Sequence, residues 1–183
     1  MSDGPTLQAG PLKLRPWRAS DLAPFAALNA DPRVMEFLPA VLDREASDAM
    51  AGRIRDHFAR HGYGLWAVEA PGETEFAGFV GLNVPTFTAH FTPCVEVGWR
   101  LAREHWGKGY ATIGARAALD FAFGRLQFDE VVALTVPDNV RSRGVMERLG
   151  MTHSADDDFD HPNLPVGHRL RRHVLYRLAR PPK

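Results

Sequence analysis

Apolar residues form short runs or alternate with polar residues in six stretches of the chain, and each stretch is predicted to be a strand. They are residues 11–17, 65–70, 75–84, 94–101, 130–136 and 171–180. The stretch 94–101 has a period of two. Val95, Val97, Trp99 and Leu101 therefore share one face, and the other face carries Cys94, Glu96, Gly98 and Arg100.

Apolar residues that recur every three or four positions predict helices over residues 21–30, 109–126 and 139–150. A further helix is expected to begin after Asp43 and to end at Gly62. Residues 31–39 are bounded by prolines and favour a short helix or a loop. The order of these elements predicts a sheet covered by helices, in the α/β or α+β class.

Length and composition narrow the functional classes. The chain has 183 residues, so we expect one domain over 1–183, with 1–10 as a loose N-terminus. Cys94 is the only cysteine, so no disulfide can form within the chain. Lys and Arg together number 22, as do Asp and Glu, and this balance argues against a nucleic-acid partner. We find neither a signal peptide nor a run of about 18 apolar residues, so we expect a cytoplasmic protein without a membrane partner.

The segment HWGKGYAT, residues 105–112, lies between a predicted strand and a predicted helix and indicates a phosphate-binding turn. Gly107 and Gly109 allow the backbone to turn with its N–H groups exposed at a helix N-terminus, which attracts anions. A Walker A motif is excluded because Gly109 follows Lys108 where Ser or Thr is required, and Thr112 departs from the dinucleotide fingerprint. A turn that binds no ligand remains the alternative.

Two segments resemble motifs of the GNAT acetyltransferase superfamily, in particular its RimJ/RimL-like branch. One is the loop Trp106-Gly-Lys-Gly109-Tyr-Ala111, in which Trp106 replaces the family's polar first residue. The other is a helix whose motif positions hold Asn139, Ser142, Met146, Gly150 and Met151. The resemblance runs from residue 12 to residue 178. It implies the GNAT fold, with a mixed, mostly antiparallel sheet of about seven strands, about four helices and a splayed acyl-CoA site.

The resemblance also implies a reaction, in which an acetyl group moves from acetyl-CoA directly to a primary amine within a ternary complex. Acetyl-CoA is the implied cosubstrate, and no metal is required. The implied pantetheine contacts are Trp99, Arg100 and Leu101, where Gly98 is a natural position for a β-bulge. The implied phosphate contacts are Gly107, Lys108, Gly109, Tyr110, Ala111 and Thr112.

Two residues are candidates for catalysis. Glu96 is the candidate base, provided that burial raises its pKa; the alternative is a structural carboxylate paired with Arg100. Many family members protonate the leaving thiolate with a Tyr, but Met146 occupies that position, so Ser142 is the candidate thiol contact. A Ser142 bonded to the carbonyl four residues earlier is the alternative. Asn139 is expected either to order the pantetheine or the strand junction, or to cap its helix.

The acceptor side is less clear from the sequence. The resemblance nominates Met35, Phe37 and Leu38, for which core packing is the alternative, and also Asp158, Asp160 and His161 from the acidic stretch 156–173. A small-molecule amine or a peptide α-amine is favoured over a protein lysine, because an α-amine needs only a weak base. Alternative functions are an acyl-CoA-binding sensor without catalysis and a metalloprotein built on the Asp/His stretch. A homodimer also stays open, since the family contains both monomers and dimers.

Overall fold

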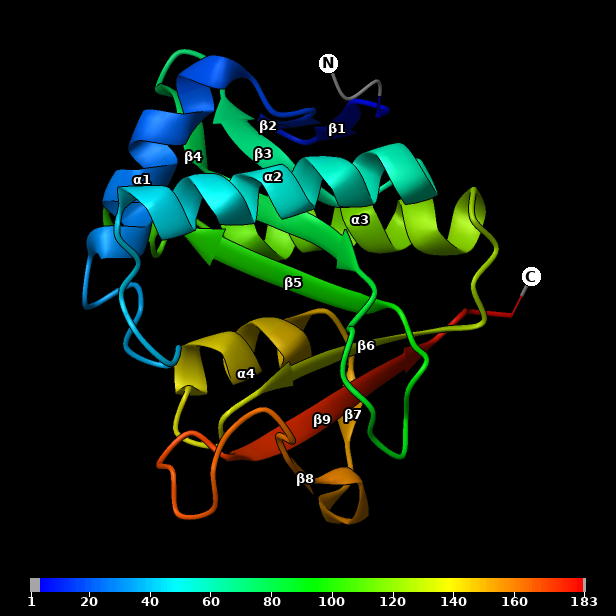
Figure 1. The fold of residues 1–183 in the computed structure, drawn as a ribbon. Helices are drawn as coiled ribbons and strands as arrows, with labels where there is room; N and C mark the ends of the chain where they lie inside the picture. The colour runs from blue at the N-terminus through cyan, green and yellow to red at the C-terminus, as the bar shows by residue number, and fades with distance from the viewer. Residues whose placement is uncertain (1–3, 183) are drawn as a thin grey trace.

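A central sheet organises the chain, and the computed structural model describes residues 4–182 of it (Figure 1). The strands are β1 (Leu7–Ala9), β2 (Leu12–Arg15), β3 (Leu65–Ala70), β4 (Thr74–Asn83), β5 (Glu96–Leu101), β6 (Glu130–Thr135), β7 (Thr152–His153), β8 (Phe159–Asp160) and β9 (Arg172–Ala179). Within the described residues their order is β1-β2-β3-β4-β5-β6-β9-β7, and β8 pairs with β9 beside this path. Neighbouring strands are antiparallel except β5 and β6, which are parallel.

The helices begin and end close to the positions that the sequence predicts. They are α1 (Leu22–Ala30), α2 (Arg44–His61), α3 (Tyr110–Gly124) and α4 (Val140–Arg148), with short 3₁₀ turns η1 (Ala19–Asp21), η2 (Arg103–His105) and η3 (Ala155–Asp157). The Asp43 side chain caps α2 by accepting from the Ala46 N–H, and Gly62 ends that helix at φ 73°. None of the helices in residues 4–182 has the length and apolar character needed to cross a membrane.

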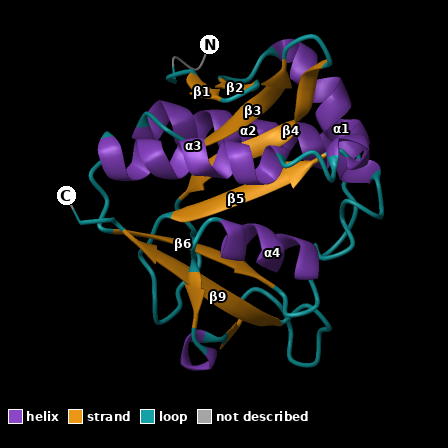
Figure 2. Ribbon diagram, turned by 180° about the vertical axis from the view of Figure 1, so that it is seen from behind, coloured by secondary structure: helices purple, strands orange, loops and turns teal. Residues whose placement is uncertain are grey.

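The helices divide between the two faces of the sheet (Figures 1 and 2). Successive residues of β4 show the division. Phe79 packs edge-on against Phe25 of α1, whereas a Cβ placed on Gly114 of α3 would lie only 3.3 Å from the Val80 side chain. Thus α1 and α2 lie over one face, and α3 lies over the other with α4 beside it. Most buried apolar side chains form one core between these layers.

The fold class is confirmed, and three details differ from the expectation. The sheet has nine strands among the described residues rather than about seven, because β1 and β8 are short additions at its margins. The expectation of a loose N-terminus is wrong for Leu7–Ala9, which pairs with β2; residues 1–3 lie outside the described part. The β-bulge expected at Gly98 is also absent, since β4 and β5 stay in continuous register from Glu96 to Leu101.

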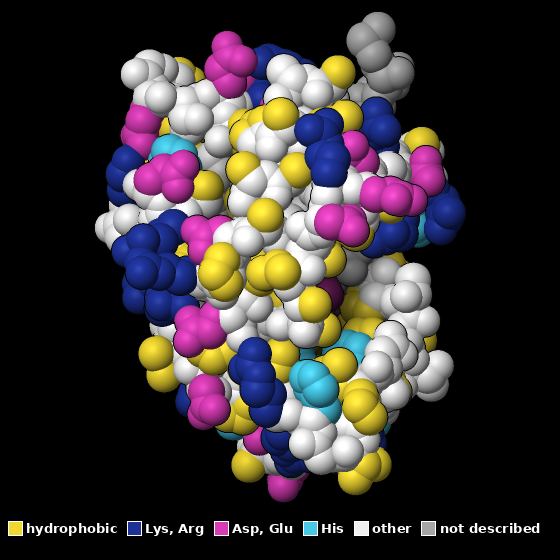
Figure 3. All heavy atoms as spheres, turned by 60° about the vertical axis from the view of Figure 1, so that its left-hand side comes forward, with side chains coloured by type: hydrophobic (Ala, Val, Ile, Leu, Met, Phe, Trp, Pro, Cys, Tyr) yellow, Lys and Arg dark blue, Asp and Glu magenta, His cyan; other side chains and the backbone are white. Residues whose placement is uncertain are grey.

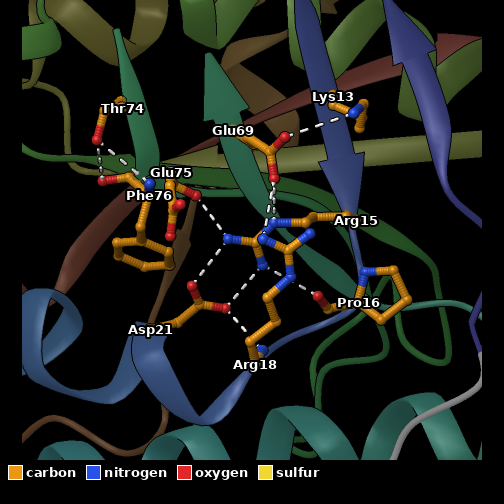
Figure 4. A network of polar contacts seen from close by, with 9 residues as sticks. All are labelled: Lys13, Arg15, Pro16, Arg18, Asp21, Glu69, Thr74, Glu75 and Phe76. Atoms are coloured by element: carbon orange, nitrogen blue, oxygen red, sulfur yellow. Dashed lines mark hydrogen bonds and ion pairs between the residues drawn. The ribbon is translucent and has the colours of Figure 1, made fainter. Parts of the chain in front are cut away.

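A buried ion-pair network fixes β2 to β3 and to η1 (Figure 4). Arg15 of β2 is only 2% exposed, and its two terminal nitrogens donate to both carboxylate oxygens of Asp21 at 2.8 and 2.9 Å. Its Nε donates to Glu69 of β3 at 2.7 Å. Asp21 also accepts from the Arg18 N–H at 2.7 Å, so η1 is fixed to the same cluster. The geometry satisfies both charges, which is the condition for a buried ion pair to be tolerated.

We predict that Asp21→Ala lowers the free energy of unfolding by about 3–5 kcal/mol, because it leaves the buried Arg15 without its bidentate partner. Urea unfolding followed by circular dichroism measures the change. The control is Arg44→Ala, which removes an exposed i,i+4 pair with Asp48 and should cost less than about 1 kcal/mol. Equal losses in the two variants would contradict a special role for the buried pair.

Candidate functional site

A cleft of about 870 Å³ opens where β5 and β6 separate. Figure 3 shows a hollow in the surface of the molecule, with histidine side chains at its lower edge. The cleft is lined by β5, the glycine loop that follows it, the starts of α3 and α4, and the segment after α1. Its volume lies in the range of small-molecule and cofactor sites.

The separation of the two parallel strands leaves part of the β5 backbone facing the cleft. In the described chain β6 pairs with β5 only at Glu96 and Val132. The backbone of the even-numbered residues of β5 forms hydrogen bonds with β4, and the Ala102 N–H continues this pattern by donating to Ala77 O. Because backbone groups alternate in direction along a strand, the N–H and C=O of Trp99 point the other way, into the gap. Leu101 O accepts from the Trp106 indole at 2.9 Å. The open amide groups of Trp99 suit an amide-rich ligand, as the sequence predicts.

The glycine loop has the conformation that an anion site requires. Gly107 and Gly109 have φ of 75° and 79°, a region that residues with a side chain rarely adopt. Gly109 is the N-cap of α3 and supplies no side-chain cap, so the first N–H groups of the helix are left for a ligand. Besides both glycines, the cleft lining includes Tyr110, Ala111 and Thr112.

Glu73, in the turn between β3 and β4, holds this loop from outside the cleft. It accepts from the Lys108 ammonium and from the Tyr110 hydroxyl at 2.6 Å, and the His105 ring lies 3.1 Å away. The hydrogen bonds from Lys108 and Tyr110 lower the pKa of Glu73 to about 2. Lys108, expected from the sequence to contact the phosphates, is not among the residues that line the cleft, because its ammonium is directed to Glu73. Sequence reasoning missed Glu73, which is 35 positions from Lys108.

Two arginines of α4 add positive charge beside the loop, and sequence reasoning missed them too. The Arg141 guanidinium lies 4.5 Å from the centre of the Trp106 ring. Arg148 Nε lies 3.5 Å from Thr112 Oγ1. Both arginines line the cleft and are suited to bind phosphate. The signal available in the sequence was the density of arginines in residues 141–148, directly after Asn139.

Glu96 lies at the start of β5 and lines the cleft opposite Asn83 of β4. Removal from water raises the pKa of its carboxyl to about 7, against a smaller opposing effect of a hydrogen bond with Asn83. The alternative of a structural pair with Arg100 is not found. Among the described residues, no ion pair joins Glu96 to a cation, and Arg100 bonds instead to Asn29. A carboxyl with a pKa near neutrality is suited to proton transfer.

Asn139 and Ser142 are placed by the start of α4. Asn139 Oδ1 caps the helix by accepting from the Ser142 N–H at 3.2 Å, while its Nδ2 donates to Thr135 Oγ1 of β6 at 3.0 Å. The capping role of Asn139 is therefore present, and its second hydrogen bond joins α4 to the end of β6. The Ser142 side chain lines the cleft, and in the described structure its hydroxyl makes no hydrogen bond to the carbonyl four residues earlier. Tyr176 is 3% exposed and lies outside the lining.

The acceptor residues expected from the sequence divide into two groups. Phe37 and Leu38 line the cleft, whereas Met35 is 5% exposed and does not. Core packing accounts for Met35.

The three acceptor candidates of the acidic stretch, Asp158, Asp160 and His161, do not line the cleft either. Asp158 bonds to His153 at 2.7 Å, and Asp160 pairs with Arg171 and Arg172. His161 packs against the ring of His173, and it is His173 that lines the cleft. Asp158 and Asp160 are thus bonded within the protein rather than directed into the cleft, and the attraction of an ammonium group stays a prediction. No group of three or more metal-binding side chains occurs in residues 4–182.

Comparison with known proteins connects this geometry to a family. Residues 12–152 match the model of the acetyltransferase (GNAT) domain. An uncharacterized protein of Bacillus subtilis, YkkB, is 35% identical over 71% of this chain and 74% of its own length. The FsC-acetyl coenzyme A-N(2)-transacetylase of Aspergillus fumigatus is 33% identical over 81% of this chain, which spans 66% of that protein. Mycobacterium smegmatis RimJ, solved in complex with CoA-disulfide, superposes with a TM-score of 0.75 at 21% identity, over 97% of this chain and 88% of that one.

We predict that Glu73→Ala weakens acetyl-CoA binding by roughly tenfold, because a loop that is no longer held must be ordered on binding. Isothermal titration calorimetry with CoA measures the change. Glu75→Ala is the matched control, since it removes an exposed acid at the start of β4, two positions along the chain, whose side chain makes no bond to the loop among the described residues. Unchanged affinity in the Glu73 variant would show that the tether does not organise the loop.

Proposed function

Because the chain belongs to the GNAT acetyltransferase family, and is therefore an acetyl-CoA-dependent acyltransferase, we propose that it acetylates a primary amine on a small molecule or at a peptide N-terminus. One observation carries the proposal. Glu96, whose pKa burial raises to about 7, lies in the cleft where β5 and β6 separate. Ser142 lines the same cleft and is suited to contact the thiol.

The strength of this base favours an α-amine over a lysine side chain. A peptide α-amine has a pKa of about 7.7–8.0, so its proton passes to Glu96 with little free-energy cost. A lysine ammonium has a pKa of about 10.4, more than three units above that of Glu96, so transfer of its proton to Glu96 is strongly unfavourable. Glu96 is therefore matched to an acceptor that is already partly neutral at physiological pH. A single water molecule is sufficient to relay the proton.

The remaining residues position the thioester and its leaving group. Acetyl-CoA supplies an activated acetyl carbon. The glycine loop, Arg141 and Arg148 bind its phosphates, and the backbone of Trp99 pairs with the pantetheine amides. The neutral nitrogen forms a bond to the carbonyl carbon and the carbon–sulfur bond breaks. Glu96 takes the first proton, from the ammonium group. The second proton, which the nitrogen loses as the amide forms, ends on the departing sulfur and gives the CoA thiol, and Ser142 donates a hydrogen bond to that sulfur. A thiol with a pKa near 8.5 needs little further help to leave.

The relatives support an amine acceptor of this kind. The Aspergillus relative is named for transfer to a nitrogen, the N(2) of FsC. The structural likeness to RimJ supports placement in the RimJ/RimL-like branch.

An amine panel tests the reaction. With acetyl-CoA and thiol release as the readout, short peptides with free α-amines should give a kcat/KM at least about tenfold above Nα-blocked lysine peptides, because of the pKa difference. If no amine gives turnover above hydrolysis while CoA still binds, the proposal fails and a sensor without catalysis takes its place.

The pH profile tests Glu96 itself. Since its pKa is raised to about 7, the base form and the activity should appear as pH rises through about 7. In Glu96→Gln this rise of activity with pH should disappear, and kcat above pH 7 should fall by about 10²–10⁴-fold. The variant should be at least as stable as the wild type at pH 8, because an ionised, desolvated carboxylate costs folding free energy above its raised pKa. A limb near pH 7 that persists in Glu96→Gln would exclude Glu96 as the base.

A further inference from the structure

Arg100 presents a positive charge to the cleft without a counter-ion. We propose that the amine acceptor also carries a carboxylate, separated from the amine by a short spacer, and that Arg100 binds this carboxylate. The inference rests on the proposed function and specifies its substrate class.

The direction of the Arg100 side chain places it on the acceptor side. Arg100 is paired in register with Phe79, whose ring packs against α1, and the guanidinium lies 5.3 Å from the centre of that ring. The neighbouring Trp99 is paired with Val80, which faces α3. The glycine loop begins α3, on the opposite face of the sheet. Arg100 therefore points away from the phosphate site and toward the side of Phe37, Met50 and α1.

The charge of Arg100 is not neutralised within the protein. Among the described residues, no carboxylate lies within 4.0 Å of its nitrogens, whereas the buried Arg15 has two such partners. Removal from water lowers the pKa of Arg100 to about 10, so the side chain is still a cation at neutral pH. A desolvated and unpaired cation is costly, and an anion that enters the cleft offsets that cost.

Arg100 is also held in place by a buried amide. Its Nη1 donates to Asn29 Oδ1 at 2.6 Å and lies 3.7 Å from Met50 Sδ. Asn29 is fully buried and is fixed in turn by a bond from its Nδ2 to Ser47 Oγ at 2.9 Å. The other guanidinium nitrogens, Nε and Nη2, have no hydrogen-bond partner among the described residues. Neither nitrogen is fully buried. They therefore reach the open space of the cleft, where two parallel N–H groups suit a carboxylate.

The spacing along β5 sets the length of the acceptor. Glu96, Gly98 and Arg100 share one strand face, so the α-carbons of Glu96 and Arg100 are about 13 Å apart at 3.3 Å per residue. A Cβ placed on Gly98 would meet no atom within 4 Å, so the floor between the two charges is open. An acceptor with its amine and carboxylate some distance apart fits this arrangement better than a free α-amino acid, in which one carbon carries both groups. A short peptide acid, or a small molecule with amine and carboxylate at opposite ends, spans the distance.

Triglycine and triglycinamide test the inference, because they differ only in the terminal carboxylate. Binding of each to the CoA-saturated protein is measured by calorimetry, and acetylation of each is measured by thiol release. We expect triglycine to exceed its amide by at least about tenfold in affinity and in kcat/KM. Glycine and glycinamide should show no such difference. Arg100→Gln should abolish the preference for the acid, while Arg100→Lys retains part of it. Arg44→Gln, which removes an exposed charge outside the cleft, should leave it unchanged.

The outcomes separate the two proposals. Equal binding of the acid and the amide, or a preference that survives in a folded Arg100→Gln, overturns the carboxylate site. A preference in binding without acetylation of either compound overturns the proposed function alone. If Arg100→Gln instead weakens CoA binding and leaves the acid preference intact, Arg100 serves the CoA phosphates and the inference is wrong. If Arg100→Gln does not fold, the comparison is made between the wild type and Arg100→Lys. An equal preference for triglycine over triglycinamide in these two proteins then overturns the carboxylate site.

Discussion

The separation of two parallel strands determines the rest of the site. β5 and β6 meet at a single pair, Glu96 and Val132, and then diverge. Each strand leads to a helix that starts beside the opening, α3 after β5 and α4 after β6. The glycine loop, the cap residue Asn139 and Ser142 therefore come together although they are separated by some thirty positions in the sequence. Ligand sites at the ends of diverging parallel strands follow from the same geometry in other α/β proteins. In this chain the rest of the sheet is antiparallel and serves to hold the opening in position.

Loss of water acts on two opposite charges within this opening. It raises the pKa of Glu96 and lowers the pKa of Arg100, because in each case the charged form loses hydration. Arg15 shows what the fold does with a buried charge that serves structure alone, since that side chain has partners on two carboxylates. Arg100 has no carboxylate partner among the described residues, which is consistent with a cation that binds a ligand. The cleft is thus prepared to take a proton at one end and an anion at the other.

The sequence was sufficient for the elements that depend on local pattern. Periodicity located the longer strands and the four helices of the described residues, and the glycines at 107 and 109 located the turn before α3, because each feature is determined within a few residues. Contacts between distant segments could not be found in this way. Glu73 reaches the loop from a turn, and Arg100 is oriented by Asn29, 71 positions away. The partners of the acidic stretch were hidden for the same reason, since Asp160 is paired with Arg171 and Arg172 only once β8 lies against β9.

The single amide of Asn139 has a mechanical consequence. Its oxygen belongs to the cap of α4 and its nitrogen to the end of β6, so one planar group joins the helix to the strand. A tilt of α4 relative to β6 would break one of these hydrogen bonds. The two hydrogen bonds therefore hold α4, β6 and, through its pairing with β6, β9 as one unit on the far side of the opening from β5.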